Sequence, residues 1–162
     1  MNILLHEPEI PQNTGNIART CVATGTALHL IEPLGFFIDE KSVKRAGLDY
    51  WDLLDLHVYS SFEDFCLKNP DATIFMATTK ARQTYAQVTY PKDSFIMFGK
   101  ESAGIPEDLL VRYKDTSIRI PMLDAIRSLN LSNAVAIVLY EALRQSEFNS
   151  LMLEGQLRDY TW

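Results

Sequence analysis

Short apolar runs alternate with helix-like segments along the chain of 162 residues, and this alternation limits the folds it can adopt. The apolar runs have the length and composition of buried strands and lie at residues 3–5, 27–31, 57–59, 73–77, 95–98 and 117–120. Helical patterns fall between or after them, at residues 14–24, 40–45, about 61–67, from Pro106 onward, and about 130–145. We therefore predict a single α/β domain over residues 1–162, with a mostly parallel sheet flanked by helices.

The composition excludes several other classes of protein. A hydrophobic share of 47% with 22% charged residues argues against a disordered chain, and no apolar run reaches the length of a membrane span. Cys21 and Cys66 cannot build a disulfide framework or a zinc site alone, so we expect core thiols and a cytoplasmic protein. His6, His29 and His57 lack the spacing of metal ligands and are expected to be structural, so no metal is predicted.

Three polar loops follow strands, and ligands in such folds bind beyond the carboxyl ends of the strands. In the first loop, Gly15 would let the backbone approach an anion at a helix N-terminus, and Arg19 would direct a cation toward the same mouth. The alternative is that Asn13 or Thr14 only caps the helix and Arg19 is solvated.

The second loop, residues 98–106, joins an apolar strand to a helix. Gly99 and Gly104 could cradle a nucleotide-like ligand, although their spacing matches neither a dinucleotide-binding fingerprint nor a P-loop. Glu101 could accept a hydrogen bond from a ribose hydroxyl, a ligand amine or a neighbouring asparagine. Taken alone, this pattern is more typical of a simple turn between a strand and a helix than of a ligand site.

The third loop, residues 127–133, is dense in hydrogen-bonding side chains, which belong to Arg127, Ser128, Asn130, Ser132 and Asn133. A helix cap needs only one or two of these groups. The loop therefore indicates either a site for a polar ligand or a segment satisfied by its own side chains.

Taken in order, the three loops resemble the motifs of the SPOUT superfamily of RNA methyltransferases, in particular its small TrmL (YibK) type. The matching residues are Asn13, Gly15 and Arg19, then Phe98-Gly99, Glu101 and Gly104-Ile105-Pro106, then Ile120-Pro121-Met122 with residues 128–133. The resemblance covers nearly the whole chain and leaves about the last dozen residues as a tail.

The resemblance implies a deep C-terminal trefoil knot, which general topology rules would not suggest. It also implies that S-adenosyl-L-methionine (AdoMet) binds in the knot and leaves as S-adenosyl-L-homocysteine. The cofactor-binding positions that it implies are Ala77, Gly99, Gly104, Ile120, Met122, Ser128, Leu129 and Asn133.

The substrate implied by the resemblance is the ribose 2′-hydroxyl of the wobble nucleotide, position 34, in the anticodon stem-loop of a tRNA. This nucleotide would be a cytidine or a modified uridine. Arg19 is assigned to the acceptor site, where we interpret it as a positioning group because arginine is a poor base. Asn13 and Glu101 are expected to hold the first two loops together.

For the third loop, we expect Ser128 and Asn130 to shape the cofactor site, and Ser132 or Asn133 to cap the last helix. Lys100 and Ala103 depart from members that carry proline and arginine at these positions.

A homodimer through the knot region is expected, because the last helix is apolar almost all round and members of the family pair there. The residues expected to contact RNA are Arg19, Lys41, Lys44, Arg45, Lys80 and Lys100. The formal net charge of -6 excludes a broadly basic RNA-coating protein, but it does not exclude one basic surface.

Two other functions stay open at the level of sequence. One is a non-catalytic RNA- or nucleotide-binding module with the same fold. The other is a small-molecule enzyme of the α/β class.

Overall fold

The computed structural model describes residues 1–37 and 51–162, and these ranges form a seven-stranded sheet in the order β3-β2-β1-β6-β4-β7-β5. Every pair of neighbouring strands is parallel. The strands are β1 (Asn2–His6), β2 (Ala27–Ile31), β3 (Leu56–Tyr59), β4 (Ile74–Ala77), β5 (Gln83–Thr84), β6 (Phe95–Phe98) and β7 (Ser117–Arg119). The predicted α/β class with a parallel sheet is confirmed.

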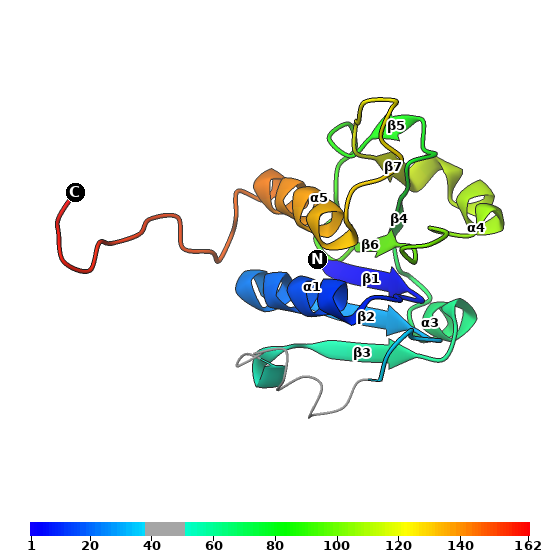
Figure 1. The fold of residues 1–162 in the computed structure, drawn as a ribbon, viewed down its shortest axis with the longest axis horizontal. Helices are drawn as coiled ribbons and strands as arrows, with labels where there is room; N and C mark the ends of the chain where they lie inside the picture. Colours follow the sequence, from blue (N-terminus) through cyan, green and yellow to red (C-terminus); the bar gives the residue numbers. More distant parts are fainter. Residues whose placement is uncertain (38–50) are drawn as a thin grey trace.

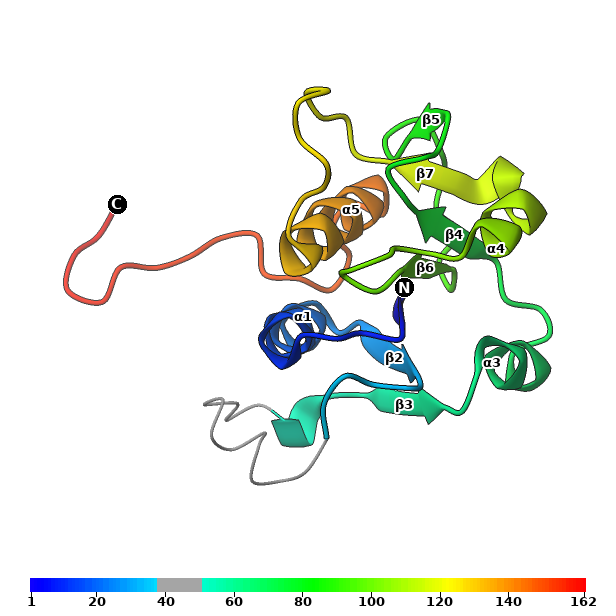
Figure 2. The same cartoon turned by 45° about the vertical axis from the view of Figure 1, so that its right-hand side comes forward.

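Helices cover both faces of the sheet. The helices α1 (Pro11–Thr24) and α5 (Leu131–Gln145) lie side by side on one face (Figure 1). The shorter α3 (Phe62–Lys68) and α4 (Glu107–Arg112) lie on the other, as the turned view in Figure 2 shows. Two 3-10 turns, η1 (Trp51–Leu53) and η2 (Lys114–Thr116), precede β3 and β7.

Strand side chains alternate between two hydrophobic cores, one on each face. Ile3 and Leu5 pack in the core under α1 and α5, whereas Leu4 packs in the core under α3 and α4. All three side chains are fully or almost fully buried. Burial on both faces explains why the central strands read as apolar runs.

Several predicted boundaries move by a few residues. The helix expected at residues 14–24 begins at Pro11, because proline is well suited to the first helical position, and it ends at Thr24 with Gly25 (φ 63°) as its C-cap. Helix α4 begins at Glu107, after Pro106, and β7 ends at Arg119, before Ile120. Ser61 caps α3, since its side chain accepts a hydrogen bond from the Asp64 N–H.

The helix expected at residues 40–45, with Lys41, Lys44 and Arg45, lies outside the described residues. Beyond α5, the chain forms a tail that leaves the body of the molecule (Figure 1). Phe148 and Leu151 at its start pack partly against the core, whereas the large side chains that follow are exposed, with Met152 at 93% and Trp162 at 92% of their full accessible area. The trefoil knot stays a prediction.

No helix in the described part of the chain is long and apolar enough to cross a membrane. Within the same residues, no group of three or more His, Cys, Asp or Glu side chains is placed to hold a metal ion.

His29 is buried in an aromatic cluster, as expected of a structural histidine. Its ring stacks on His57 with 4.5 Å between centroids, and its Nδ1 is 3.0 Å from the Tyr59 hydroxyl. Burial, together with the neighbouring His57, lowers the pKa of His29 to about 4. The fold therefore stabilises the neutral ring.

We expect the free energy of unfolding to fall as the pH drops from about 6.5 toward 4. Over this window the unfolded chain protonates His29 while the folded chain does not, so stability is lost with acidification, by about 2 kcal/mol. Urea denaturation of the wild type and of His29→Phe at several pH values tests this. The free energy of unfolding of the variant should fall less over this pH range than that of the wild type. An equal dependence on pH in the two proteins would contradict the assignment of the effect to His29.

Candidate functional site

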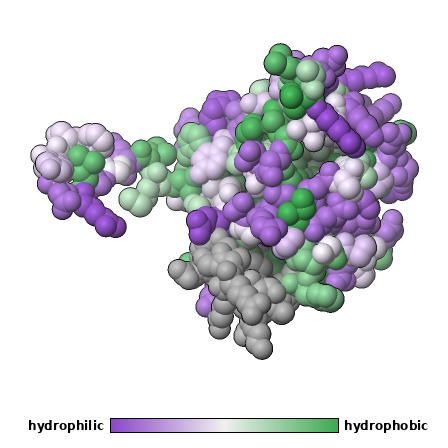
Figure 3. Space-filling model, in the orientation of Figure 1, coloured by the Kyte–Doolittle hydropathy of each residue, from purple (hydrophilic) through white to green (hydrophobic). Residues whose placement is uncertain are grey.

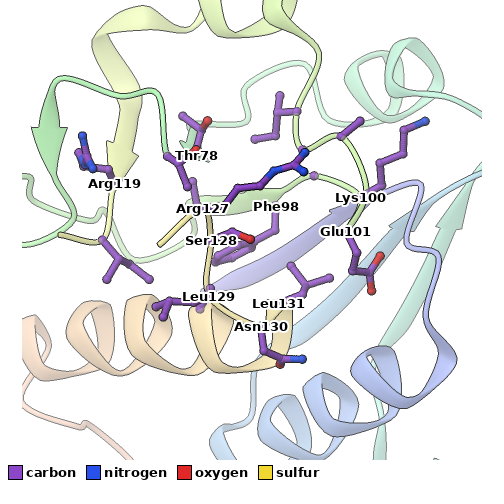
Figure 4. Close-up of a pocket in the computed structure, with 18 of the residues that line it drawn as sticks. Thr78, Phe98, Lys100, Glu101, Arg119, Arg127, Ser128, Leu129, Asn130 and Leu131 are labelled. Atoms are coloured by element: carbon purple, nitrogen blue, oxygen red, sulfur yellow. The ribbon is translucent and has the colours of Figure 1, made fainter. Parts of the chain in front are cut away.

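A cavity of about 510 Å³ opens at the carboxyl ends of the central strands, which is a size suited to a small-molecule ligand. Its wall is made by the segments that follow β4, β6 and β7, together with the first turn of α1 and part of α5 (Figure 4). The lining comprises residues 77–80, 98–105, 118–120, 122 and 127–131, with Ile10, Asn13, Ala134 and Val138. The three loops singled out in the sequence therefore meet at one site.

Most of the predicted cofactor-binding residues line this cavity. They are Ala77, Gly99, Gly104, Ile120, Met122, Ser128 and Leu129. Asn133 does not line it: this residue is exposed in the first turn of α5, where its backbone N–H donates to Asn130 Oδ1 at 3.4 Å. Thr78 and Phe98 line the cavity without having been predicted as contacts.

The 99–104 loop is closed tightly by its own backbone. The Gly104 N–H donates to the Lys100 carbonyl at 2.8 Å, and Gly104 has a φ of 74°, which favours glycine. A Cβ at Gly99 would overlap the backbone of Gly104 and Ile105. Both glycines are therefore required by the turn itself, and the turn forms one wall of the cavity.

A chain of hydrogen bonds joins the three loops through Glu101, Asn13 and Asn130. Asn13 Nδ2 donates to Glu101 Oε1 at 2.9 Å, and Asn130 Nδ2 donates to Asn13 Oδ1 at 3.0 Å. Glu101 also accepts from the backbone N–H groups of Glu9 (2.8 Å) and Ile10 (3.3 Å). The link expected between Asn13 and Glu101 is thus present, and the third loop is part of the same network.

Asn130, and not Ser132 or Asn133, caps α5. Its Oδ1 accepts from the backbone N–H groups of both residues, at 3.0 and 3.4 Å, and from the Ser132 hydroxyl at 2.7 Å. The alternative that Asn13 or Thr14 caps α1 is wrong, because Ile10 stands at that position and makes no side-chain cap. Asn13 instead lies inside the helix, where its amide faces the other loops.

Replacing Glu101 by glutamine should destabilise the protein by about 2 kcal/mol, because Glu101 accepts three hydrogen bonds and an amide offers only one oxygen. Thermal unfolding measures the change. Glu107→Gln is the matched control, since Glu107 is exposed and bound only to Lys80 among the described residues. Equal melting temperatures for Glu101→Gln and the wild type would show that the network adds little stability.

The cations around the cavity differ in their partners. Lys80 Nζ lies 2.6 Å from Glu107 Oε1, and Lys100 Nζ lies 2.6 Å from Glu7 Oε2. The hydrogen bond to Glu7 raises the pKa of Lys100. Arg119 and Arg127 also line the cavity, although sequence reasoning did not place them among the RNA contacts. Arg119 is the last residue of β7, and Arg127 belongs to the polar third loop that follows this strand.

Arg19 lies apart from the cavity lining. It is exposed on α1, six residues beyond Asn13, which corresponds to about 240° around the helix and about 9 Å along its axis. A helix that begins at Pro11 rather than at Thr14 therefore does not direct Arg19 into the same mouth as Asn13. Its role at the acceptor site stays a prediction.

Residues 1–140 match the SpoU rRNA Methylase family. The chain belongs to the SpoU methylase family. This assignment confirms the resemblance to RNA methyltransferases that the three motifs indicate.

A SpoU relative from Listeria monocytogenes, provisionally named a tRNA (cytidine(34)-2'-O)-methyltransferase, is 51% identical over 156 residues, which cover 94% of this chain and 92% of the relative. A solved structure described as giving insights into the 2-OH methylation of C/U34 on tRNA is 41% identical. It has a TM-score of 0.85 and covers 90% of this chain and 95% of that chain. An AdoMet-bound rRNA methyltransferase from Sinorhizobium meliloti is 26% identical, with a TM-score of 0.77, over 88% of this chain and 55% of that chain.

Proposed function

We propose that this protein transfers the methyl group of AdoMet to the ribose 2′-hydroxyl of nucleotide 34 of a tRNA, either a cytidine or a modified uridine. The observation that carries the proposal is the cavity at which all three sequence motifs meet. The relatives named for this reaction, which match over nearly the whole chain, support the choice of substrate.

The cavity fits AdoMet in size and chemistry. Phe98, Ile118 and Val138 provide apolar walls suited to an adenine ring. The glycine-bearing turn at 99–104 exposes backbone at one side, and the polar loop at 127–130 closes another. Bound there, AdoMet would supply an electrophilic methyl group on its sulfonium.

The residues around the cavity would position the acceptor. The hydrogen bond between Asn13 and Glu101 holds the first two loops together, which would fix the shape of the opening through which a ribose approaches. Arg19, which lies outside the cavity lining on the exposed face of α1, would orient the RNA through its fixed positive charge, and would not itself remove the hydroxyl proton. This division of roles assigns the methyl donor to the cavity and the orientation of the RNA to a cation outside its lining.

The proposal includes a homodimer through the knot region. Ile137 and Tyr140 on α5 leave 38% and 47% of their area exposed. Figure 3 shows hydrophobic atoms where the tail leaves the body, beyond this helix. Burying such side chains against a second chain would stabilise a dimer and would bring the basic residues of two chains together.

Labelled AdoMet and unmodified tRNA transcripts test the proposal. Label should appear on nucleotide 34 after nuclease mapping, and a transcript with a 2′-deoxynucleotide at this position should accept none. Label on a base would contradict the reaction. Binding of AdoMet and tRNA without transfer would favour the non-catalytic binding module.

A further inference from the structure

The third loop carries an arginine over the mouth of the cavity. Arg127 lies in the segment between β7 and α5, which contains no helix or strand, and its side chain is exposed. Figure 4 shows the Arg127 side chain reaching across toward the loop that holds Lys100 and Glu101. Its Nη2 is 3.5 Å from the Ser102 carbonyl oxygen, which is the limit of a hydrogen bond.

This contact leaves most of the guanidinium available. Arginine has five N–H donors in a planar fork, and the Ser102 carbonyl is the one acceptor found for Arg127 among the described residues. A fork with free donors at a cavity mouth is suited to bind a phosphate through two parallel hydrogen bonds.

Two carboxylates at this rim oppose the approach of an RNA substrate, and a cation there would offset them. Glu9 accepts from the backbone N–H and the hydroxyl of Ser102, both at 2.8 Å, and these bonds lower the pKa of Glu9. Glu101 lies beside it and accepts from neutral N–H groups. The two carboxylates would repel a phosphodiester that approaches Ser102.

The lysines at the mouth offset this repulsion only partly. Lys100 and Lys80 each lie 2.6 Å from a carboxylate, of Glu7 and Glu107 respectively. A phosphate would have to compete with these ion pairs. Arg127 lies over Ser102 itself and has no such competitor among the described residues.

We propose that Arg127 is the residue that binds a phosphate flanking the methylated ribose and so positions the RNA at the cavity. The inference rests on the proposed function and adds a substrate contact to it. Ser102 and Arg127 would hold the second and third loops together until RNA displaces this weak contact.

The test measures tRNA affinity by fluorescence anisotropy and AdoMet affinity by calorimetry, for the wild type, Arg127→Ala and Arg127→Lys. We expect Arg127→Ala to weaken tRNA binding about tenfold and to lower the slope of log affinity against log salt by about one. Arg127→Lys should restore the slope but only part of the affinity, because an ammonium is a point charge. AdoMet affinity should change less than about twofold in both variants.

Arg112→Ala is the matched control, since Arg112 is exposed on α4 and does not line the cavity. Unchanged tRNA affinity and salt slope in Arg127→Ala would overturn the inference. So would a loss of AdoMet affinity alone, which would assign Arg127 to the carboxylate of the methyl donor. Binding of tRNA is measured separately from methyl transfer. A wild-type protein that binds tRNA without methylating it would therefore contradict the proposed function but not the role of Arg127.

Discussion

Replacing Gly99 by alanine is expected to abolish AdoMet binding and, with it, methyl transfer. The added Cβ would overlap the backbone of Gly104 and Ile105. Backbone atoms cannot move out of the way by changing a rotamer, as a flexible side chain can. The 99–104 turn would have to open, and this turn is a wall of the cavity. We expect AdoMet affinity to fall about 100-fold or more and the free energy of unfolding to fall by about 3 kcal/mol.

Calorimetry with AdoMet and urea denaturation measure the two effects. Gly104→Ala should have a smaller effect, because a Cβ there meets nothing within 4 Å and only the φ of 74° is unfavourable. Gly155→Ala is the control, since this glycine has neither a close neighbour nor a positive φ. Wild-type AdoMet affinity in Gly99→Ala would show that the turn is not part of the donor site.

Most of the sheet could be predicted from the sequence because its central strands are buried on both faces. Each apolar run in the sequence corresponds to a strand, and Ala27–Ile31 and Phe95–Phe98 match to the residue. Strand β5 was missed because it has only two residues, Gln83 and Thr84, and both are polar. The Gln83 side chain bonds the carbonyls of Asp115 and Ser117, which are far away in the sequence.

The site could be predicted only in part, because its partners are distant in sequence. The order of the motifs was enough to bring Asn13, Glu101 and the third loop together. The pairing of Lys100 with Glu7, 93 residues away, leaves no local pattern in the sequence. The same holds for Arg127, whose contact with Ser102 appears only once β7 and β6 lie in the same sheet.

Replacing Arg19 by alanine is expected to lower kcat/KM for tRNA about 100-fold or more, because the cation that orients the ribose or its phosphate would be lost. AdoMet affinity should stay within about twofold of the wild type, since Arg19 does not line the cavity. This combination separates a residue of the acceptor side from Gly99, whose replacement should abolish binding of the donor.

Methyl transfer from labelled AdoMet, together with calorimetry and thermal unfolding, checks the prediction. Arg19→Lys keeps the charge but not the planar fork, so it should recover only part of the rate. Arg112→Ala should retain full activity, because Arg112 lies on α4, on the opposite face of the sheet from α1. Wild-type transfer by Arg19→Ala would exclude Arg19 from the acceptor site. A loss of AdoMet affinity in this variant would instead indicate that α1 supports the donor cavity, through Asn13 and its bond to Glu101.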